Sequence, residues 1–279
     1  MSEQKGGVNS FNKLILPRLK PRTGLAVMLA AIRALFFREI QTRFGQYRLG
    51  YLWVVIEPAL NIGFMLLIFG AVKEKASPGI DFIVFLINGI IPFFMFREIC
   101  KQSLSAIQSN GGLFIYRPVR PIDALISRSI LELICFFIAY IGFSVIAVIC
   151  DYKIAFSNIP ELFFYWCILF IFSISCSLSL MVIGDFSKEI SKFINAFFLV
   201  IYLMSGIIYS IHIIPQPYQS YLLLNPIIHV VELMRHCISP SYILIEGIQL
   251  SYFIYWLLGS LLIGLLLYTK FEKRMMKTK

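Results

Sequence analysis

Long hydrophobic runs without charged residues alternate along this chain with short clusters of basic residues. A single segment can satisfy its own backbone polar groups in lipid only as a helix, and about 18 to 20 apolar residues suffice to cross a bilayer. The pattern therefore predicts an all-α membrane protein with about six transmembrane helices. We place these spans at residues 51–72, 82–96, 133–150, 162–184, 193–211 and 250–268.

The second span is short, because Arg97 and Glu98 follow after only fifteen apolar residues. We expect it to borrow length from its flanks or to lie in locally thinned lipid.

The uncharged stretch at 193–231 is instead too long for one span, because thirty-nine helical residues would overreach the bilayer nearly twofold. Pro215, Pro217 and Pro226 lie where such a stretch would have to turn. We therefore predict a re-entrant or interfacial helical hairpin over 212–249.

Composition supports this assignment. The chain is 59% hydrophobic and 14% charged, with a mean hydropathy of +0.81, whereas a typical soluble domain is roughly 25% charged. An ordinary soluble domain is thereby excluded. Residues 1–23 are basic and lack an apolar run ending in a cleavage site, so we expect a cytoplasmic tail there, not a signal peptide. Residues 49–279 then form one six-helix transmembrane domain.

Basic residues are distributed unevenly between the predicted loops. With both termini in the cytoplasm, 21 of the 25 Lys and Arg residues fall on the cytoplasmic side, as the positive-inside rule requires. We therefore expect a multi-pass protein of a bacterial inner membrane with both termini cytoplasmic. The net charge of +10 is then an orientation signal, and it implies no nucleic-acid partner.

Residues 24–48 are predicted to form an amphipathic helix in the cytoplasmic interface. Its apolar arc consists of Phe36, Phe37, Ile40, Phe44 and Tyr47, and the opposite face of Arg38, Glu39, Gln41 and Thr42. One interpretation is a simple anchor on membrane lipid. The other is that Arg38, Arg43 and Arg48 also receive an anionic lipid head group or glycan at a substrate access site.

Glu57 lies near the start of the first predicted span and is followed by Pro58. An ionisable group within a span is a functional candidate, here for substrate access. The alternative is that Glu57 pairs with a neighbouring arginine at the interface.

The loop predicted at 101–128 mixes aromatic, basic and proline residues. Pro121 suits the first turn of a short helix. The loop is either a positive-inside connection or a rigid surface that a cytoplasmic partner contacts.

Metal and catalytic chemistry find little support in the sequence. The six cysteines include no C-x-x-C pair, and we expect no metal at His229, Glu232 and His236 although they share one helix face. The acidic residues with catalytic potential are dispersed, at Glu57, Asp123, Glu132 and Asp185.

No Gly-Lys dipeptide occurs, so this chain has no phosphate-binding loop of the Walker type. If ATP drives the protein, a separate subunit binds the ATP and Mg, and this chain itself carries no cofactor.

Several segments, in the same order and over nearly the whole chain, resemble the type 2 ABC exporter permeases that export capsular polysaccharide. They are REIQTRFG at 38–45, RLGYLW at 48–53, EP at 57–58, NGIIPFF at 88–94, YRPVRPID at 116–123 and NPIIHVVELMR at 225–235. The amino-terminal tail departs from the pattern, because it is longer than in the family.

The resemblance implies a homodimer with two copies of a cytoplasmic ABC ATPase. It also implies export of a lipid-linked acidic polysaccharide, with the hairpin facing periplasmic and outer-membrane capsule export proteins. The ATPase would contact Tyr116, Arg117, Pro118, Arg120, Pro121 and Asp123. Aromatic residues would line the glycan path, for which our candidates are Trp53, Tyr202 and Tyr209; ordinary packing is the alternative role for each.

Two other functions remain open at this point. A type 2 ABC exporter of O-antigen, teichoic acid or a small drug is the first alternative. A membrane-embedded glycan-modifying enzyme is the second, but it would require a cluster of acid, base or nucleophile at the membrane face.

Overall fold

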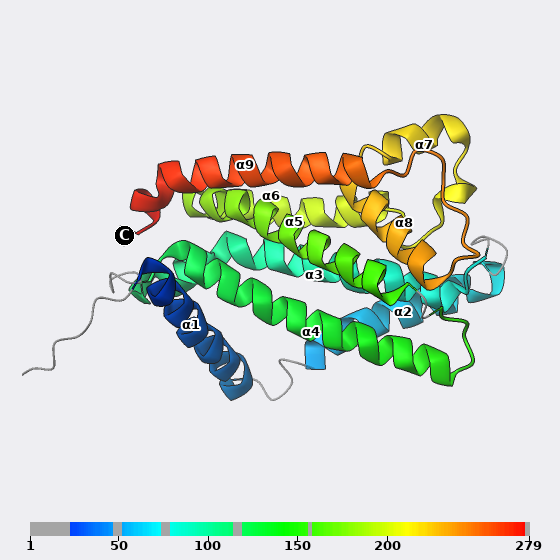
Figure 1. Ribbon diagram of the computed structural model, residues 1–279, viewed down its shortest axis with the longest axis horizontal. Coiled ribbons are helices and arrows are strands. Elements are labelled where there is room, and N and C mark those ends of the chain that lie inside the picture. The colour runs from blue at the N-terminus through cyan, green and yellow to red at the C-terminus, as the bar shows by residue number, and fades with distance from the viewer. Residues whose placement is uncertain (1–22, 47–51, 74–78, 114–118, 156–157, 277–279) are drawn as a thin grey trace, which may run out of the picture.

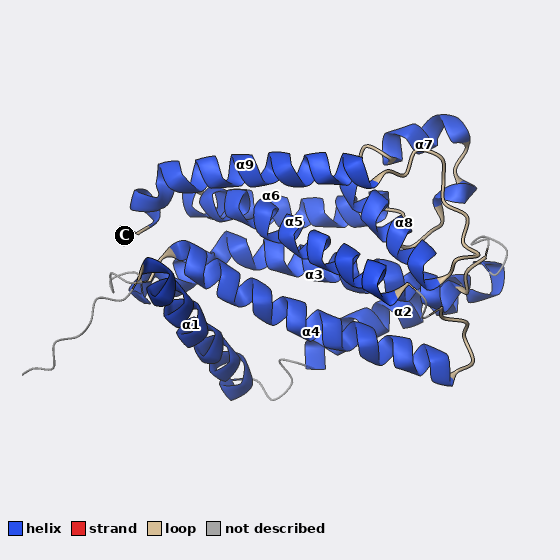
Figure 2. Ribbon diagram, viewed as in Figure 1, coloured by secondary structure: helices blue, strands red, loops and turns tan. Residues whose placement is uncertain are grey.

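The computed structural model describes residues 23–46, 52–73, 79–113, 119–155 and 158–276, and within these ranges all regular structure is helical (Figure 2). The all-α membrane class predicted from the sequence is confirmed. The elements in chain order are α1 (Gly24–Gln46), α2 (Leu52–Lys73), α3 (Phe82–Asn110), η1 (Gly111–Leu113), α4 (Pro121–Ile149), α5 (Ile159–Phe186), α6 (Lys188–Met204), η2 (Ile211–Ile213), α7 (Gln216–Leu222), α8 (Pro226–Ile238) and α9 (Leu250–Met275).

The long helices form a bundle around α3, as Figure 1 shows. Residues on every side of the first half of α3, 82–96, are buried, among them Phe85, Ile90 and Phe93, as expected for a helical segment that is apolar all round. Helices α7 and α8 cap one end of the bundle, whereas α1 and the end of α9 lie at the other. The two ends therefore differ in structure as well as in charge.

Glycines allow α5 to pack closely on α3 and on α9. A Cβ atom on Gly184 would lie 2.1 Å from the carbonyl oxygen of Leu104 in α3, and one on Gly264 of α9 would lie 2.8 Å from the carbonyl oxygen of Ser175. Small residues have this role between membrane helices, where close backbone approach replaces the hydrophobic driving force.

Four helices of the described chain are long and apolar enough to cross a membrane: α3, α4, α5 and α9. Helix α2 has 22 residues and α6 has 17, which at about 1.5 Å per residue gives about 33 and 26 Å against a hydrocarbon core of about 30 Å. Both lie alongside the longer helices in the bundle (Figure 1). That they complete six spans stays a prediction.

Three predicted boundaries are corrected by the structure. The second span does not end near residue 96, because α3 continues through Arg97 to Asn110. The loop predicted at 101–128 is consequently shorter: its first part belongs to α3, and α4 begins at Pro121 as a helix of 29 residues, not as a short one. The fifth helix ends at Met204, before the 211 predicted.

The amphipathic pattern predicted for 24–48 is also corrected. The helix exists as α1, but Glu39 does not face away from the bundle: its carboxylate lies 3.1 Å from the guanidinium of Arg128 on α4, and both side chains are mostly buried. Phe37, assigned to the apolar arc, is half exposed, as expected for a ring that faces lipid. The cause is tertiary, because the partner that draws Glu39 inward, Arg128, is far away in the sequence, whereas Gln41 and Thr42 of the same face remain exposed.

Candidate functional site

An ion pair joins the first two helices of the bundle. Glu57 of α2 accepts a hydrogen bond from Arg97 of α3 at 2.6 Å, and the two side chains are 33% and 17% exposed. The Arg97 guanidinium also lies 4.0 Å from the ring centroid of Phe94. The pairing alternative proposed for Glu57 is thus confirmed, and its partner is the residue that had marked the end of the second span.

A groove opens beside this pair along α2. It has a volume of about 590 Å³, and its lining includes Trp53, Glu57 and Asn61. The amide oxygen of Asn61 accepts a hydrogen bond from the Tyr202 hydroxyl of α6 at 2.8 Å. Three helices therefore contribute to one partly polar region.

A second groove, of about 360 Å³, lies between α3 and α6. It is lined by Glu98, Lys101, Gln102, Leu104, Ser105, Gln108, Ser191 and Asn195. Behind it, the amide of Gln102 donates to the buried carboxylate of Glu132 at 2.6 Å and to Glu98 at 3.2 Å. These amides, hydroxyls and charges are the groups that hydrogen-bond to sugar hydroxyls.

The start of α4 is a well-defined helix terminus. Pro121 occupies the first turn, where no intrahelical N–H is needed, and the Asp123 carboxylate accepts a hydrogen bond from the Arg120 backbone N–H at 2.9 Å. The Arg120 side chain is 67% exposed and lies 4.0 Å from Glu272 of α9. Tyr116, Arg117 and Pro118 lie outside the described residues.

A buried charge network holds α8 in place at the other end of the bundle. Arg235 donates to Glu232 at 2.7 Å and to the backbone carbonyls of Gly206 and Ile207, and it stacks on the Phe85 ring at 3.4 Å. The Tyr242 hydroxyl donates to the second oxygen of Glu232 at 2.8 Å.

Gly89 of α3 makes room for this network, because a Cβ atom there would lie 2.7 Å from an Arg235 nitrogen. The predicted hairpin therefore contacts α3 through Arg235, whose pair with Glu232 inside α8 is almost completely buried, 0% and 1% exposed.

The two histidines considered as metal ligands have protein partners instead. His229 Nε2 contacts the Leu223 carbonyl oxygen at 2.9 Å, while its Nδ1 accepts from the Gln249 backbone N–H at 3.0 Å. His236 Nδ1 contacts the Tyr242 carbonyl oxygen at 2.9 Å. Each side chain is thus engaged in fixing the loop between α8 and α9.

The structure brings together only some of the residues predicted for substrate access and for the path. Trp53 and Glu57 share one groove, and Tyr202 reaches it through Asn61, although the Tyr202 ring itself is buried against Phe93 and Phe94. Tyr209 lies in the turn after α6, at the end capped by α7 and α8 (Figure 1).

Of the arginines on the first helix, Arg38 lies on α1 with a partly buried side chain. Arg48 and the side chain of Arg43 lie outside the described residues. Arg97, Gln102 and Asn195 were missed by the sequence reasoning. Arg97 was treated as the end of a span, although a basic residue after so short an apolar run was itself a signal.

Comparison with known proteins places the chain in a family. The family model for ABC-2 type transporters matches residues 30–239. The chain is 42% identical over 255 residues to the polysialic acid transport protein KpsM of Escherichia coli, covering 91% of this chain and 98% of that one.

Two further relatives are more distant. The capsule polysaccharide export inner-membrane protein CtrC of Neisseria meningitidis is 28% identical, covering 89% of this chain and 94% of its own. The O-antigen export system permease protein RfbA of Klebsiella pneumoniae is 23% identical, covering 92% and 97%. With its bundle of apolar helices, this multi-pass chain belongs to the ABC-2 type transporter family of membrane proteins.

Proposed function

We propose that this chain is the permease subunit of an ATP-driven exporter that moves a lipid-linked acidic capsular polysaccharide across the bacterial inner membrane. The observation that carries the proposal is the 42% identity to KpsM over nearly the full length of both chains. Export of O-antigen is supported less well, since that relative is 23% identical. Export of teichoic acid or a small drug rests on the shared family alone.

The proposed assembly is a homodimer with two copies of a cytoplasmic ABC ATPase, which supplies ATP and Mg. Both termini lie in the cytoplasm, in agreement with the uneven distribution of Lys and Arg. The bundle end capped by α7 and α8 then faces the periplasm and the capsule export proteins there.

The mostly apolar groove along α2 and the polar groove between α3 and α6 form part of the glycan path. Arg97 is the main contact, because a guanidinium binds a carboxylate or phosphate through two parallel hydrogen bonds. In the structure, which contains no polymer, the Glu57 carboxylate pairs with the Arg97 guanidinium at an N–O distance of 2.6 Å. An acidic group of the polymer displaces Glu57 as the partner of Arg97. The next acidic group along the polymer then replaces the first at Arg97.

Trp53 lines the groove along α2 together with Glu57 and is 58% exposed. Its ring therefore offers a flat face to the glycan beside the Glu57–Arg97 pair. Arg38 and Arg43 of α1, together with Arg48, which follows α1 in the sequence, receive the anionic head group on the cytoplasmic side.

Coupling to the ATPase runs through the segment 116–123. In the described part of this segment, the exposed residue Arg120 caps the start of the long helix α4. A force applied at Arg120 is therefore transmitted along the whole length of the bundle.

The proposal is tested by deleting the gene and localising the polymer. Export requires that lipid-linked polysaccharide accumulates inside the cell and that surface polymer disappears. Supplying the wild-type gene in trans must restore both. Absence of any polymer would contradict the proposal and support the glycan-modifying enzyme instead. Unchanged surface polymer would exclude capsule export altogether.

A further inference from the structure

The groove between α3 and α6 contains a lysine without a partner. Lys101 lines this groove and its side chain is partly buried. Among the described residues, neither an ion pair nor a hydrogen bond engages its ammonium group. Charges that are withdrawn from water are normally paired. The Lys101 ammonium group is therefore available to an anion from outside the chain.

The one carboxylate on α3 is held away from this lysine. Glu98 lies three positions earlier and lines the same groove, a spacing at which helical side chains of opposite charge commonly pair. Instead, the Gln102 amide donates a hydrogen bond to Glu98 at 3.2 Å and another to the buried carboxylate of Glu132 on α4 at 2.6 Å. Gln102 thus draws Glu98 toward α4 and leaves Lys101 without a counter-charge.

Hydrogen-bonding groups surround Lys101 in the groove. The side-chain amides of Gln108 on α3 and Asn195 on α6 line it, and no described residue forms a hydrogen bond with either amide. The side-chain oxygen of Gln102 is buried and also lacks a partner within the described chain. Amides both donate to hydroxyl groups and accept from them. A ligand that fits this groove combines one anionic group with several hydroxyls, as an acidic sugar does.

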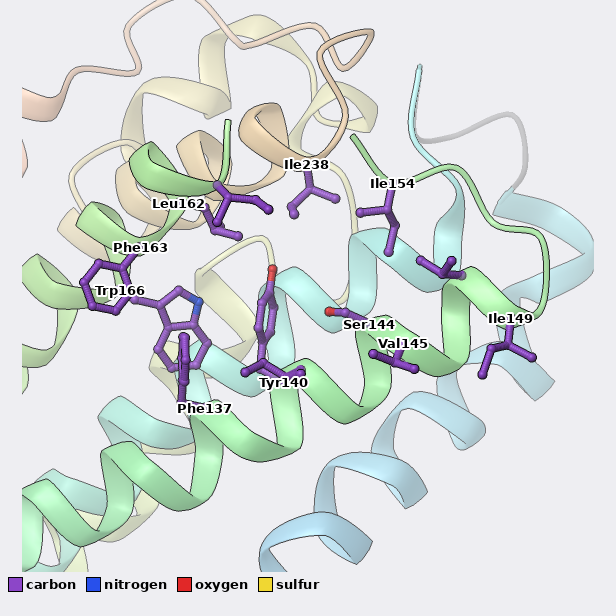
Figure 3. Close-up of a pocket in the computed structure, with 13 residues that line it drawn as sticks. Phe137, Tyr140, Ser144, Val145, Ile149, Ile154, Leu162, Phe163, Trp166 and Ile238 are labelled. Carbon is purple, nitrogen blue, oxygen red and sulfur yellow. The ribbon is translucent and has the colours of Figure 1, made fainter. Parts of the chain in front are cut away.

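The apolar cavity between α4 and α5 provides the contrast (Figure 3). Its lining includes Phe137, Val145 and Trp166 and contains no charged residue. An acidic sugar would lose its hydration there without gaining a partner for its charge, which is costly. Of the two, only the groove between α3 and α6 offers the groups that an acidic glycan requires.

Lys101 lies on the same stripe of α3 as Arg97. Four residues separate the two side chains by about 40° around the helix and by about 6 Å along it. This separation is close to the length that one sugar unit adds to an extended polymer. Helix α3 ends at Asn110, at the end of the bundle where α1 lies (Figure 1). In the proposed orientation, a polymer that enters from the cytoplasm therefore meets Lys101 before Arg97.

We infer that the groove between α3 and α6 binds one acidic sugar of the polymer, with Lys101 as the partner of its anionic group. The amides of Gln102 and Asn195 bind its hydroxyls. Gln102 is also a positioning residue, because it keeps Glu98 from neutralising Lys101. The inference rests on the proposed export of an acidic glycan and specifies the substrate class: a polymer with acidic groups on neighbouring sugars, which Lys101 and Arg97 bind in succession.

Binding of capsular oligosaccharide to the purified full-length chain tests this inference. The probe is a short, fluorescently labelled acidic oligosaccharide prepared from the capsule of the producing strain, and the chain is reconstituted in phosphatidylcholine without anionic lipid. Lys101→Gln is expected to weaken binding about tenfold, as for the loss of a charged hydrogen bond. Lys101→Arg keeps the charge and should weaken it less. Lys192→Gln, the same change at an exposed lysine of α6 that does not line the groove, should bind as wild type does.

A pair of variants tests the positioning role of Gln102 separately. Gln102→Met releases Glu98 toward Lys101, so binding should weaken several-fold. Adding Glu98→Gln removes the competing carboxylate and should restore most of the binding. Both variants lack the amide of Gln102 equally, so a merely structural role of that residue predicts no such rescue. Binding that stays weak in the double variant would contradict the positioning role.

The outcomes separate this site from the proposed function. Equal binding by wild type and Lys101→Gln overturns the site but leaves export in place, because the polymer then binds elsewhere. An equal loss with Lys192→Gln overturns it too, since overall charge would then suffice. Absence of binding to wild type contradicts the glycan path altogether. If Lys101 is required instead for retention of added phosphatidylglycerol, and oligosaccharide binding does not depend on it, the groove holds a lipid head group and the inference is wrong.

Discussion

Two of the arginine–carboxylate pairs of this protein, one within α8 and one between α2 and α3, differ chiefly in access to solvent. Glu232 and Arg235 are buried completely, and backbone carbonyls and Tyr242 occupy their remaining hydrogen-bonding groups. Glu57 and Arg97 are partly exposed and lie beside a groove. A pair without access can only hold the fold, whereas a pair beside a groove can exchange partners with an anion.

The largest effect should follow from breaking the buried pair. Arg235→Met leaves the Glu232 charge without its partner, which costs about 3–5 kcal/mol. We expect a large drop in protein in the membrane and in the thermal unfolding temperature of what remains. Adding Glu232→Leu, which removes both charges, should restore part of this stability. Single-variant protein as stable as wild type would show that the network does not hold α8.

The exposed pair should respond differently. Arg97→Gln is expected to lower the free energy of unfolding less than Arg235→Met does, because the Glu57 carboxylate it leaves behind is 33% exposed beside the groove. Export should nevertheless fall about tenfold or more, as expected for the loss of a charged hydrogen bond of about 1.5–3 kcal/mol.

Glu57→Gln serves as the matched control, because it leaves the guanidinium free for the polymer and should reduce export less. Surface polysaccharide at equal protein levels gives the measurement. If Arg97→Gln exports like wild type, the pair is structural, like the buried one.

A third contrast concerns the terminus of α4. Arg120→Gln removes an exposed side chain whose distance to Glu272 is 4.0 Å, so stability should change by less than about 1 kcal/mol. Export should fall, because the contact with the ATPase is weakened. ATP hydrolysis by the assembled complex should lose its dependence on the substrate. Unchanged export at equal assembly would place the coupling contact elsewhere.

The smallest effect is a dependence of stability on pH at the capped end. Burial lowers the pKa of His229 below its ordinary value of about 6.5. The folded state therefore takes up a proton less readily than the unfolded state, and its stability falls as the pH decreases below about 6.5. Unfolding temperatures at pH 7.5 and pH 5.5 should differ more for wild type than for His229→Asn. Equal differences would mean that His229 does not contribute.

Much of the fold follows from the sequence, because charge-free runs and prolines mark helices and turns directly. Pro226 begins α8 and Pro121 begins α4, as these signals indicated. The pairs between helices were not predictable, because they depend on how each helix is rotated against its neighbour. Arg97 illustrates this: its charge suggested the end of a span, but a carboxylate from α2 compensates it inside the bundle.

The central claim is that this chain exports polymer at the expense of ATP, and inverted membrane vesicles test it most directly. Vesicles containing the chain and its ATPase are supplied with lipid-linked polymer and ATP, and polymer protected from an added glycan-degrading enzyme is measured. We expect protection that requires ATP and the chain, and that falls about tenfold or more with Arg97→Gln. Protection that is equal without the chain, or without ATP, would contradict the account.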